Sequence, residues 1–184
     1  MQKPIPQTLF LDRDGVVNLR LPNTYISAWS DFQFLPGSLE ALALLNPLFP
    51  RILIVTNQQG IGKGLMTETQ LQTLHHHMLE AIHQAGGRID RIYHAPYLAQ
   101  DQSPYRKPNP GMALQAQADF PEINFSSAII VGDSVSDMQF GQRLGMQTAW
   151  VMTKTEEKHW QDQLQVDYRL SSLWEFALLM DSLK

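Results

Sequence analysis

The sequence predicts an α/β fold in which helices flank a doubly wound, Rossmann-like parallel sheet. Short runs rich in β-branched residues alternate with helix-length amphipathic segments, as βαβ units require. Several of these runs are continuously apolar, which is typical of strands buried on both faces. The chain has 184 residues, the usual length of one domain, and shows neither an internal repeat nor a linker. We therefore expect residues 1–184 to form a single domain.

The first half of the chain alternates strands and helices clearly. The expected elements are a strand at 8–12, a loop with some extended structure at 18–34, a helix opening at 36–38, a strand at 51–56, a glycine-rich polar loop at 57–64 and a long helix at 67–84. The first helix should stop at Asn46, because a residue before proline avoids helical conformation. Thr67 is expected to cap the long helix, with Gln70 at the capping-box position.

The second half continues the same alternation. The expected elements are a strand at 91–95, a proline-rich loop at 96–110, a helix at 111–119, a strand at 127–132, a helix closed by Gly145, a strand at 147–151, a charged surface loop or loose helix at 153–165, an edge strand at 167–170 and a last helix capped by Ser171. Glycine, proline and polar clusters separate these elements, which is how boundaries are usually marked.

Two carboxylates, Asp12 and Asp14, follow the first predicted strand. Side chains two residues apart on an extended backbone point the same way, so both can converge on one small volume. Gly15 then lets the chain turn away sharply. Two carboxylates this close repel each other unless a cation lies between them or one holds a proton. Both conditions suit phosphate chemistry, although the short motif alone fits a solvated acidic turn equally well.

More polar residues are expected at the same edge of the sheet. They are, in chain order, Thr56, Asn57, Lys107, Asp133 and Asp137. In open parallel sheets, ligands bind outside the carboxyl ends of the strands. Carboxylates are hard oxygen ligands for Mg²⁺. A hydroxyl, an amide and an ammonium group are the donors that phosphoryl oxygens need. The set is therefore placed as an active site requires, and its chemistry is consistent with binding of Mg²⁺ and a phosphoryl group.

Composition excludes several other classes of protein. The net charge is −4 and the pI is about 5.8, so no broad basic surface for nucleic acid is expected. The chain has no cysteine, which removes disulfides, thiolate nucleophiles and cysteine-based zinc sites. Residues 1–7 lack the apolar core of a signal peptide, and no apolar run approaches the ~20 residues of a membrane span. We expect a cytoplasmic protein with no membrane partner.

Two motifs invite readings that we reject. The stretch Gly60-Ile61-Gly62-Lys63-Gly64 is not a nucleotide-binding P-loop, because the first glycine and the Ser or Thr after lysine are missing. The tract His75-His76-His77 is not expected to bind one metal ion, because adjacent helical residues splay around the axis. We expect this tract to be a solvated helix face.

Four motifs occur in order along residues 8–151. They are Asp12-Arg13-Asp14-Gly15, Thr56-Asn57-Gln58, Arg106-Lys107-Pro108 and Val131-Gly132-Asp133-Ser134-Val135-Ser136-Asp137. In this order they resemble the haloacid dehalogenase (HAD) superfamily of phosphohydrolases, subfamily IIIA. Phe34-Leu35-Pro36-Gly37 and Asn109-Pro110-Gly111 extend the likeness to the branch of heptose bisphosphate phosphatases and histidinol phosphatases. The resemblance implies a HAD-like fold without a large cap domain.

The resemblance also implies roles for the two acidic residues of the first motif. Asp12 would attack phosphorus and form an aspartyl-phosphate. Asp14 would protonate the leaving oxygen and then activate the hydrolytic water. Mg²⁺ would be held by the Asp12 carboxylate, the Asp14 backbone carbonyl and Asp133, with help from the Ser134 region.

The remaining motif residues would bind the substrate, as the resemblance implies. Thr56 and Lys107 would hold the transferring oxygens together with Asn57. The neighbouring residues expected to contact substrate are Gln58 and Gln59. Arg106 would reach a further group, such as a second phosphate. Asp137 would support the site by orienting Lys107 or the metal shell.

One departure from the family pattern concerns zinc. Heptose bisphosphate phosphatases usually carry a zinc loop of three cysteines and a histidine before the Arg-Lys-Pro motif. The corresponding stretch here, 93–105, has His94 but no cysteine, so structural zinc is expected to be absent. Prolines at 96, 104 and 108 would stiffen this loop instead.

The expected function is therefore Mg²⁺-dependent phosphomonoester hydrolysis by a monomer. D-glycero-D-manno-heptose 1,7-bisphosphate, cleaved at the 7-phosphate, is the first substrate to consider. The alternatives are histidinol phosphate, another sugar phosphate and a nucleic-acid 3′-phosphate. A phosphotransferase or mutase would differ by passing the phosphate to an acceptor other than water. A non-catalytic phosphate-binding protein would lack the nucleophile or the acid, and both Asp12 and Asp14 are present.

Overall fold

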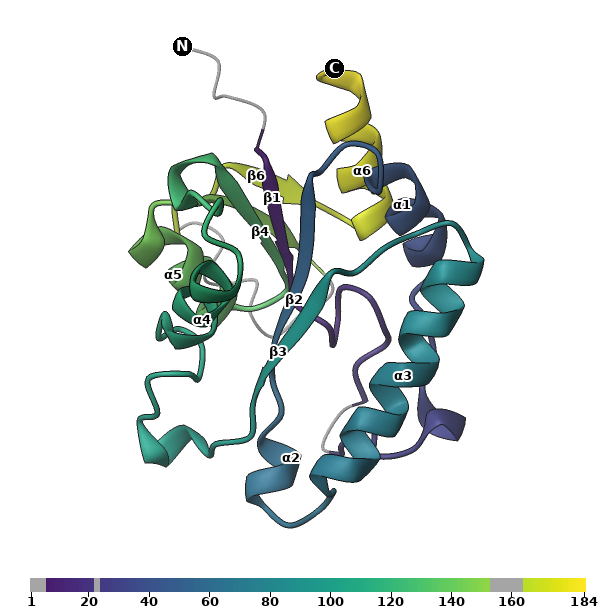
Figure 1. Ribbon diagram of the computed structural model, residues 1–184, viewed down its shortest axis with the longest axis vertical. Helices are drawn as coiled ribbons and strands as arrows, with labels where there is room; N and C mark the ends of the chain where they lie inside the picture. The colour runs from purple at the N-terminus through teal and green to yellow at the C-terminus, as the bar shows by residue number, and fades with distance from the viewer. Residues whose placement is uncertain (1–5, 22–23, 153–163) are drawn as a thin grey trace.

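The computed structural model describes residues 6–21, 24–152 and 164–184. Within them, six parallel strands form one sheet in the order β3-β2-β1-β4-β5-β6 (Figure 1). The strands are β1 (Thr8–Leu11), β2 (Arg51–Asn57), β3 (Arg91–Ala95), β4 (Ala128–Gly132), β5 (Gln147–Val151) and β6 (Tyr168–Leu170). The winding reverses at β1, which lies between β2 and β4. The predicted doubly wound parallel sheet is confirmed.

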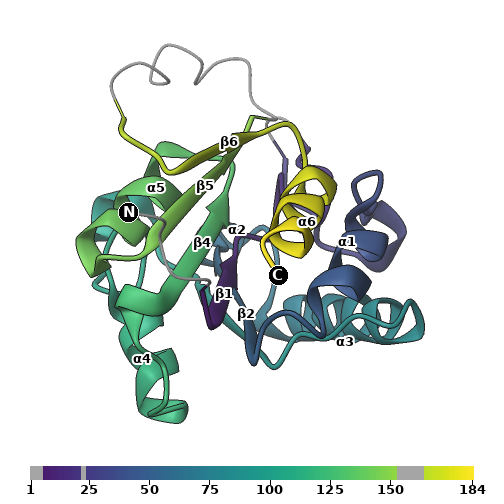
Figure 2. The same cartoon turned by 90° about the horizontal axis from the view of Figure 1, so that it is seen from above.

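Helices cover both faces of this sheet, as Figure 2 shows from above. They are α1 (Ser38–Leu45), α2 (Gln59–Gly62), α3 (Glu68–Gln84), α4 (Gly111–Asp119), α5 (Val135–Leu144) and α6 (Leu173–Ser182). The core on one face is shared by α1, α3 and α6, and the core on the other by α4 and α5. The sheet is therefore buried between two helical layers.

The continuous apolar character of the strands follows from these two cores. Successive side chains of a strand point to opposite faces. In β1, Leu9 and Leu11 join the core beneath α1 and α3, while Phe10 joins the opposite core and meets Phe140 of α5 edge to face. A strand with helices on both sides has no solvent face, so it shows no polar alternation.

The segment after β1 is ordered by contacts with the end of that strand. Val17 and Ile26 are buried in the larger core. Leu19 N–H donates to Gln33 O, and Leu35 N–H donates to Val17 O. An antiparallel bridge joins Asn18 to Phe34. The predicted loop with some extended structure is confirmed.

The structure corrects two local predictions. The glycine-rich stretch predicted as a loop at 57–64 contains the single helical turn α2. Ser172, not Ser171, caps α6, because the Ser172 hydroxyl accepts from Glu175 N–H. Ser171 lies one residue earlier and donates its N–H and hydroxyl to the Glu175 carboxylate. The capping box predicted for α3 at Thr67 and Gln70 is confirmed.

The loop predicted at 153–165 lies almost entirely outside the described residues. None of the helices in the part of the chain that the structure describes has the length and apolar character to span a membrane.

Candidate active site

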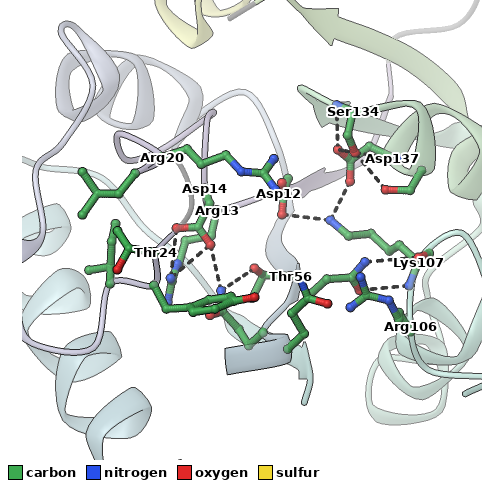
Figure 3. Close-up of a pocket in the computed structure, with 17 residues that line it drawn as sticks. Asp12, Arg13, Asp14, Arg20, Thr24, Thr56, Arg106, Lys107, Ser134 and Asp137 are labelled. Carbon is green, nitrogen blue, oxygen red and sulfur yellow. Dashed lines mark hydrogen bonds and ion pairs between the residues drawn. The ribbon is translucent and has the colours of Figure 1, made fainter. Parts of the chain in front are cut away.

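A polar cavity of about 210 Å³ opens at the carboxyl ends of β1, β2 and β4 (Figure 3). The register explains why these ends coincide, since Leu11 of β1 lies beside Ile54 of β2 and Val131 of β4. The first polar residues beyond each strand therefore face one another. The predicted residues that line the cavity are Asp12, Asp14, Thr56, Asn57, Gln58, Gln59, Arg106, Lys107, Ser134 and Asp137. Asp133 is fully buried beside it.

Lys107 is buried between two carboxylates. Its Nζ lies 2.9 Å from Asp12 Oδ1 and 2.6 Å from Asp137 Oδ1, and it also donates to the Val55 carbonyl at 2.6 Å. Burial would lower the pKa of Lys107, but Asp12 and Asp137 outweigh it and raise that pKa above its ordinary value. Lys107 is therefore a fixed positive charge beside Asp12.

The surroundings of Asp12 increase its proton affinity. Burial, only partly offset by Lys107, raises the pKa of Asp12 to about 6, and the charges of Asp137 and Asp14 add to this effect. Removing a carboxylate from water disfavours its charged form. A further cation beside Asp12 would favour ionisation, and an ionised Asp12 is the form that can attack phosphorus.

Three donors hold the carboxylate of Asp14. Arg13 Nη2 contacts Asp14 Oδ1 and Oδ2 at 3.0 and 3.1 Å. Asn18 Nδ2 donates to Oδ1 at 2.9 Å, and Gln58 Nε2 donates to Oδ2 at 2.8 Å. Burial alone would raise the pKa of Asp14, but Arg13, Asn18 and Gln58 together hold it below its usual value. Arg13, Asn18 and Gln58 thus hold Asp14 in one orientation as a carboxylate.

The second strand supplies groups that orient the site. Thr56 Oγ accepts from Gln58 Nε2 at 2.9 Å, and Gln58 is almost fully buried. Asn57 uses its side-chain amide on the Lys107 backbone, donating to the carbonyl at 3.1 Å and accepting from the N–H at 3.0 Å. The side chains of Gln58 and Asn57 bind Asp14, Thr56 and the Lys107 backbone, and their expected contact with substrate stays a prediction.

Asp12, Asp133 and Asp137 form a buried acidic cluster in which one oxygen of each lies within 4.8 Å of the others. The Asp137 oxygens already contact Lys107 Nζ and the Ser134 N–H and hydroxyl, so Asp12 and Asp133 are better placed as metal ligands. Ser134 caps α5 and bonds Ser136 Oγ. Three buried carboxylates against one ammonium leave excess negative charge, which a divalent cation with oxygen ligands would balance.

The backbone around this cluster fits a metal site. Gly15 has φ +93°, and a Cβ there would overlap Asp133 Oδ2. Only glycine therefore lets the first turn approach Asp133 this closely. The Asp14 side chain points to Arg13 and not into the cluster, so its predicted metal contact through the backbone carbonyl stays a prediction.

Arginines and an aromatic residue line the outer part of the cavity. Arg20 and Arg106 line it together with Gln59 and Tyr25. Arg20 lies 3.9 Å from Asp133 and is more than half exposed, while Arg106 donates to the Tyr97 carbonyl at 3.1 Å. Figure 3 shows the two arginines on opposite sides of the cavity, with Arg20 near Asp12 and Arg106 near Lys107.

Sequence reasoning missed the roles of Arg13 and Asn18, which hold Asp14, and of Arg20 and Tyr25, which line the cavity. The expectation of a solvated histidine tract was wrong for His75, which is buried on α3 and contacts Arg13 Nη1 at 3.0 Å. The signal was present in the spacing, because His75 shares the apolar face of Leu71 and Met78. His76 is exposed and His77 is half-buried, and both lie near Glu80.

Comparisons with known proteins agree with this geometry. A HAD-hydrolase-like family model matches residues 104–176. The chain is 34% identical over 170 residues to a D-glycero-alpha-D-manno-heptose-1,7-bisphosphate 7-phosphatase of Mycobacterium tuberculosis, covering 92% of this chain and 89% of the relative. It is also 34% identical to a D-glycero-beta-D-manno-heptose-1,7-bisphosphate 7-phosphatase of Pasteurella multocida, with 97% and 98% covered.

Solved structures give the same result. The D,D-heptose 1,7-bisphosphate phosphatase of B. bronchiseptica, complexed with magnesium and phosphate, superposes with a TM-score of 0.88 at 29% identity, covering 97% of this chain and 99% of that one. The corresponding enzyme of Burkholderia thailandensis gives a TM-score of 0.70 at 32% identity, covering 96% and 99%. This chain is therefore a phosphatase that belongs to the D-glycero-D-manno-heptose-1,7-bisphosphate 7-phosphatase family of HAD-like hydrolases.

Proposed function

We propose that this phosphatase removes the 7-phosphate of D-glycero-D-manno-heptose 1,7-bisphosphate through an aspartyl-phosphate on Asp12. The observation that carries the proposal is the placement of Asp12 and Asp14 at one cavity, in a chain that matches phosphatases named for this substrate over nearly their whole length. The small size of the cavity suits one phosphoryl group with part of a sugar.

In the first step, the Asp12 carboxylate attacks phosphorus while the bond from phosphorus to the sugar oxygen breaks. Asp14 gives that oxygen a proton, so the sugar leaves as an alcohol. Because Arg13, Asn18 and Gln58 favour the Asp14 carboxylate, the approaching phosphate must raise the Asp14 pKa for this step. In the second step, Asp14 takes a proton from water, which attacks the aspartyl-phosphate and releases phosphate and Asp12.

The other residues hold charge in place during these steps. Thr56 would donate its hydroxyl to a transferring oxygen, and the positive charge of Lys107 would stabilise the transferring oxygens from its place in the cavity lining. Asp12 and Asp133 would hold Mg²⁺, which would screen the repulsion between the nucleophile and the phosphate. Phosphoryl transfer depends mainly on such positioning and charge stabilisation. Arg106 and Arg20 would bind the second phosphate at the cavity mouth.

The test is phosphate release with Mg²⁺ from heptose 1,7-bisphosphate (both anomers), histidinol phosphate, a 3′-phosphorylated oligonucleotide and p-nitrophenyl phosphate. We expect the heptose bisphosphate to have the highest kcat/KM, and ³¹P NMR to show heptose 1-phosphate as the product. Asp12→Asn should lower kcat by roughly 10⁴-fold or more. Asp31→Asn, an exposed carboxylate in the 3₁₀ turn Trp29–Asp31, is the matched control.

A different leading substrate in this panel would overturn the substrate and leave the phosphatase chemistry intact. Transfer of phosphate to an acceptor other than water would identify a phosphotransferase. Full activity of Asp12→Asn on every compound would overturn the assigned nucleophile.

We also propose that the protein is a monomer and that the loop 93–105 functions without zinc. Within the described chain, His94 Nε2 pairs with Glu68 at 3.0 Å, and Tyr97 stacks on Tyr105 with ring centroids 6.4 Å apart. The first contact ties the start of that stretch to α3, and the second joins two residues of the loop itself. Metal analysis of the purified protein should give well below one equivalent of zinc, and light scattering should give the mass of one chain. A stoichiometric zinc content or a dimer mass would contradict the respective proposal.

A further inference from the structure

Arg13 occupies a position that the reaction scheme above leaves unexplained. It lies between the two site carboxylates in sequence, is 1% exposed and lines the cavity. Its Nη2 holds both oxygens of Asp14. A buried guanidinium can bind a carboxylate in several orientations, so something must fix its plane. The structure shows one candidate on the side away from Asp14.

That candidate is His75 of α3, which lies 62 residues away in sequence and 3.0 Å from Arg13 Nη1 through its Nε2. A guanidinium group only donates hydrogen bonds, so Nε2 must be the acceptor and the ring must be neutral with its proton on Nδ1. Burial, with Arg13 and His94 nearby, lowers the pKa of His75 to about 3, which agrees with a neutral ring. Arg13 Nε has no hydrogen-bond partner among the described residues, so His75 and Asp14 are the acceptors that orient the group.

His75 is held in turn by its surroundings. It projects from the apolar face of α3, between Leu71 and Met78. Its ring meets the ring of His94 edge to face, with centroids 6.3 Å apart, and His94 pairs with Glu68 on the first turn of the same helix. The ring therefore has a fixed position on a long, well-packed helix, which is the kind of support a precise site needs.

We propose that His75 is a positioning residue for the leaving-group proton transfer: it fixes the Arg13 guanidinium, which in turn aims the Asp14 carboxylate. This inference rests on the proposed role of Asp14 as acid and base. A misplacement of about 1 Å in such a group costs up to roughly 100-fold in rate. His75 touches neither substrate nor Asp14, so its effect should fall on the proton transfer and not on substrate binding.

The test compares leaving groups. An alkyl phosphate such as a sugar phosphate needs a proton on its leaving oxygen, whereas p-nitrophenyl phosphate leaves without one. We expect His75→Leu to lower kcat for the alkyl phosphate by about 10- to 100-fold, with less than about a 3-fold change for p-nitrophenyl phosphate and an unchanged KM. His75→Gln, whose carbonyl oxygen can accept from Arg13, should restore most of the lost kcat.

Two further variants make the result interpretable. His76→Leu changes the exposed neighbour on the same helix and should leave both rates unchanged. Asp14→Asn should show the same leaving-group selectivity as His75→Leu, but more strongly. If Asp14→Asn lacks that selectivity, the role of Asp14 fails and this inference fails with it. If Asp14→Asn shows it and His75→Leu lowers both rates equally or neither, the inference about His75 alone is wrong.

A measurement on the wild-type protein, independent of activity, tests the proposal even if the leucine variant misfolds. Two-bond ¹H–¹⁵N correlation spectra of the wild-type protein at neutral pH should show the His75 ring as the neutral Nδ1–H tautomer. A charged ring, or one protonated at Nε2, could not accept from Arg13 and would overturn the proposal.

Discussion

The charge balance of the site depends on one residue, Lys107. Its ammonium group contacts both Asp12 and Asp137. Asp14 has its own cation in Arg13. Burial, only partly offset by Lys107, raises the pKa of Asp12, whereas Arg13, Asn18 and Gln58 outweigh burial and lower the pKa of Asp14. Such divergence is how one site provides different roles for two carboxylates.

Replacing Lys107 with methionine should test this balance. The change leaves Asp12 and Asp137 buried without their shared cation, so we expect the free energy of unfolding to fall by about 3–5 kcal/mol in the absence of metal. Urea denaturation in EDTA measures it. The double variant Lys107→Met/Asp12→Asn should regain part of the loss, because one uncompensated charge is gone. Equal stability of wild type and Lys107→Met would contradict the ion-pair assignment.

The buried imidazole of His75 should make stability sensitive to acid. Its folded pKa of about 3 lies below the ordinary 6.5, with Arg13, His94 and Asp14 as the charged or titratable groups facing it. Between these two pH values, His75 binds a proton in the unfolded chain but not in the folded chain. The contribution of the neutral His75 ring to the free energy of unfolding is complete above pH 6.5. It is lost as the pH falls from 6.5 towards 3, at a slope of at most about 1.4 kcal/mol per pH unit.

Urea denaturation between pH 7.5 and 5 compares the wild type with His75→Gln. The wild type should lose stability more steeply below pH 6.5, by up to about 2 kcal/mol at pH 5 relative to the variant. Parallel curves for the two proteins would show that His75 does not carry this linkage.

At the scale of elements, the turn after β1 decides how closely the motifs approach. Gly15 packs against Asp133 and has a positive φ, and Gly132 leaves room for Asp137 at the start of α5. The N-terminal capping box of α5, formed by Ser134 and Asp137, fixes the same carboxylate that holds Lys107. A helix cap and a charge pair thus share one residue.

Comparing Gly15→Ala with Gly145→Ala should distinguish the effect of close packing against Asp133 from the effect of backbone strain at a positive φ. The new methyl group would displace Asp133, so we expect the affinity for Mg²⁺ to fall by about 10- to 100-fold. Gly145→Ala is the matched control, since Gly145 also has a positive φ but no atom within 4 Å of the added carbon. It should cost about 1–2 kcal/mol of stability without changing Mg²⁺ affinity. Titration calorimetry measures the Mg²⁺ affinity of each variant, and urea denaturation measures its stability. Equal Mg²⁺ affinities in the two variants would rule out the packing argument.

At the scale of the molecule, the sheet order brings residues from four separate segments to one edge. Strand β1 is central, and its neighbours β2 and β4 end beside it. Lys107 lies in the loop before α4. Arg143 of α5 anchors this loop by donating to Pro108 O and Asn109 Oδ1. The acidic cluster is thereby assembled only in the folded chain, so metal binding should couple to folding.

Mg²⁺ should therefore stabilise the whole fold and be needed for activity. At 100 times its dissociation constant, a ligand that binds only the folded state adds about 2.7 kcal/mol, seen as a rise in Tm. EDTA should abolish phosphate release, and added Mg²⁺ should restore it. Asp133→Asn should lose most of the Tm rise. Full activity in EDTA, or a Tm that does not respond to Mg²⁺, would refute the metal site.

The amino-acid sequence was enough to predict where the strands lie along the chain and which polar groups the site contains. Apolar runs located β1 to β6 to within about one residue at most ends, because burial on both faces leaves a strong local signal. Asp12, Asp14, Lys107 and Asp137 could be expected together because strand ends in a parallel sheet share one edge.

The hydrogen-bond partner of each polar side chain in the site could be assigned only from the folded structure. Gln58 and Asn57 line the cavity as expected, and the folded structure adds that their side chains bind Asp14 and the Lys107 backbone. His75 reaches Arg13 across 62 residues of sequence, which no local pattern specifies. The physical reason is that burial and charge pairing are properties of neighbours in space. A sequence records what each residue can donate or accept, whereas the placement of α3 beside the turn after β1 makes His75 the partner of Arg13.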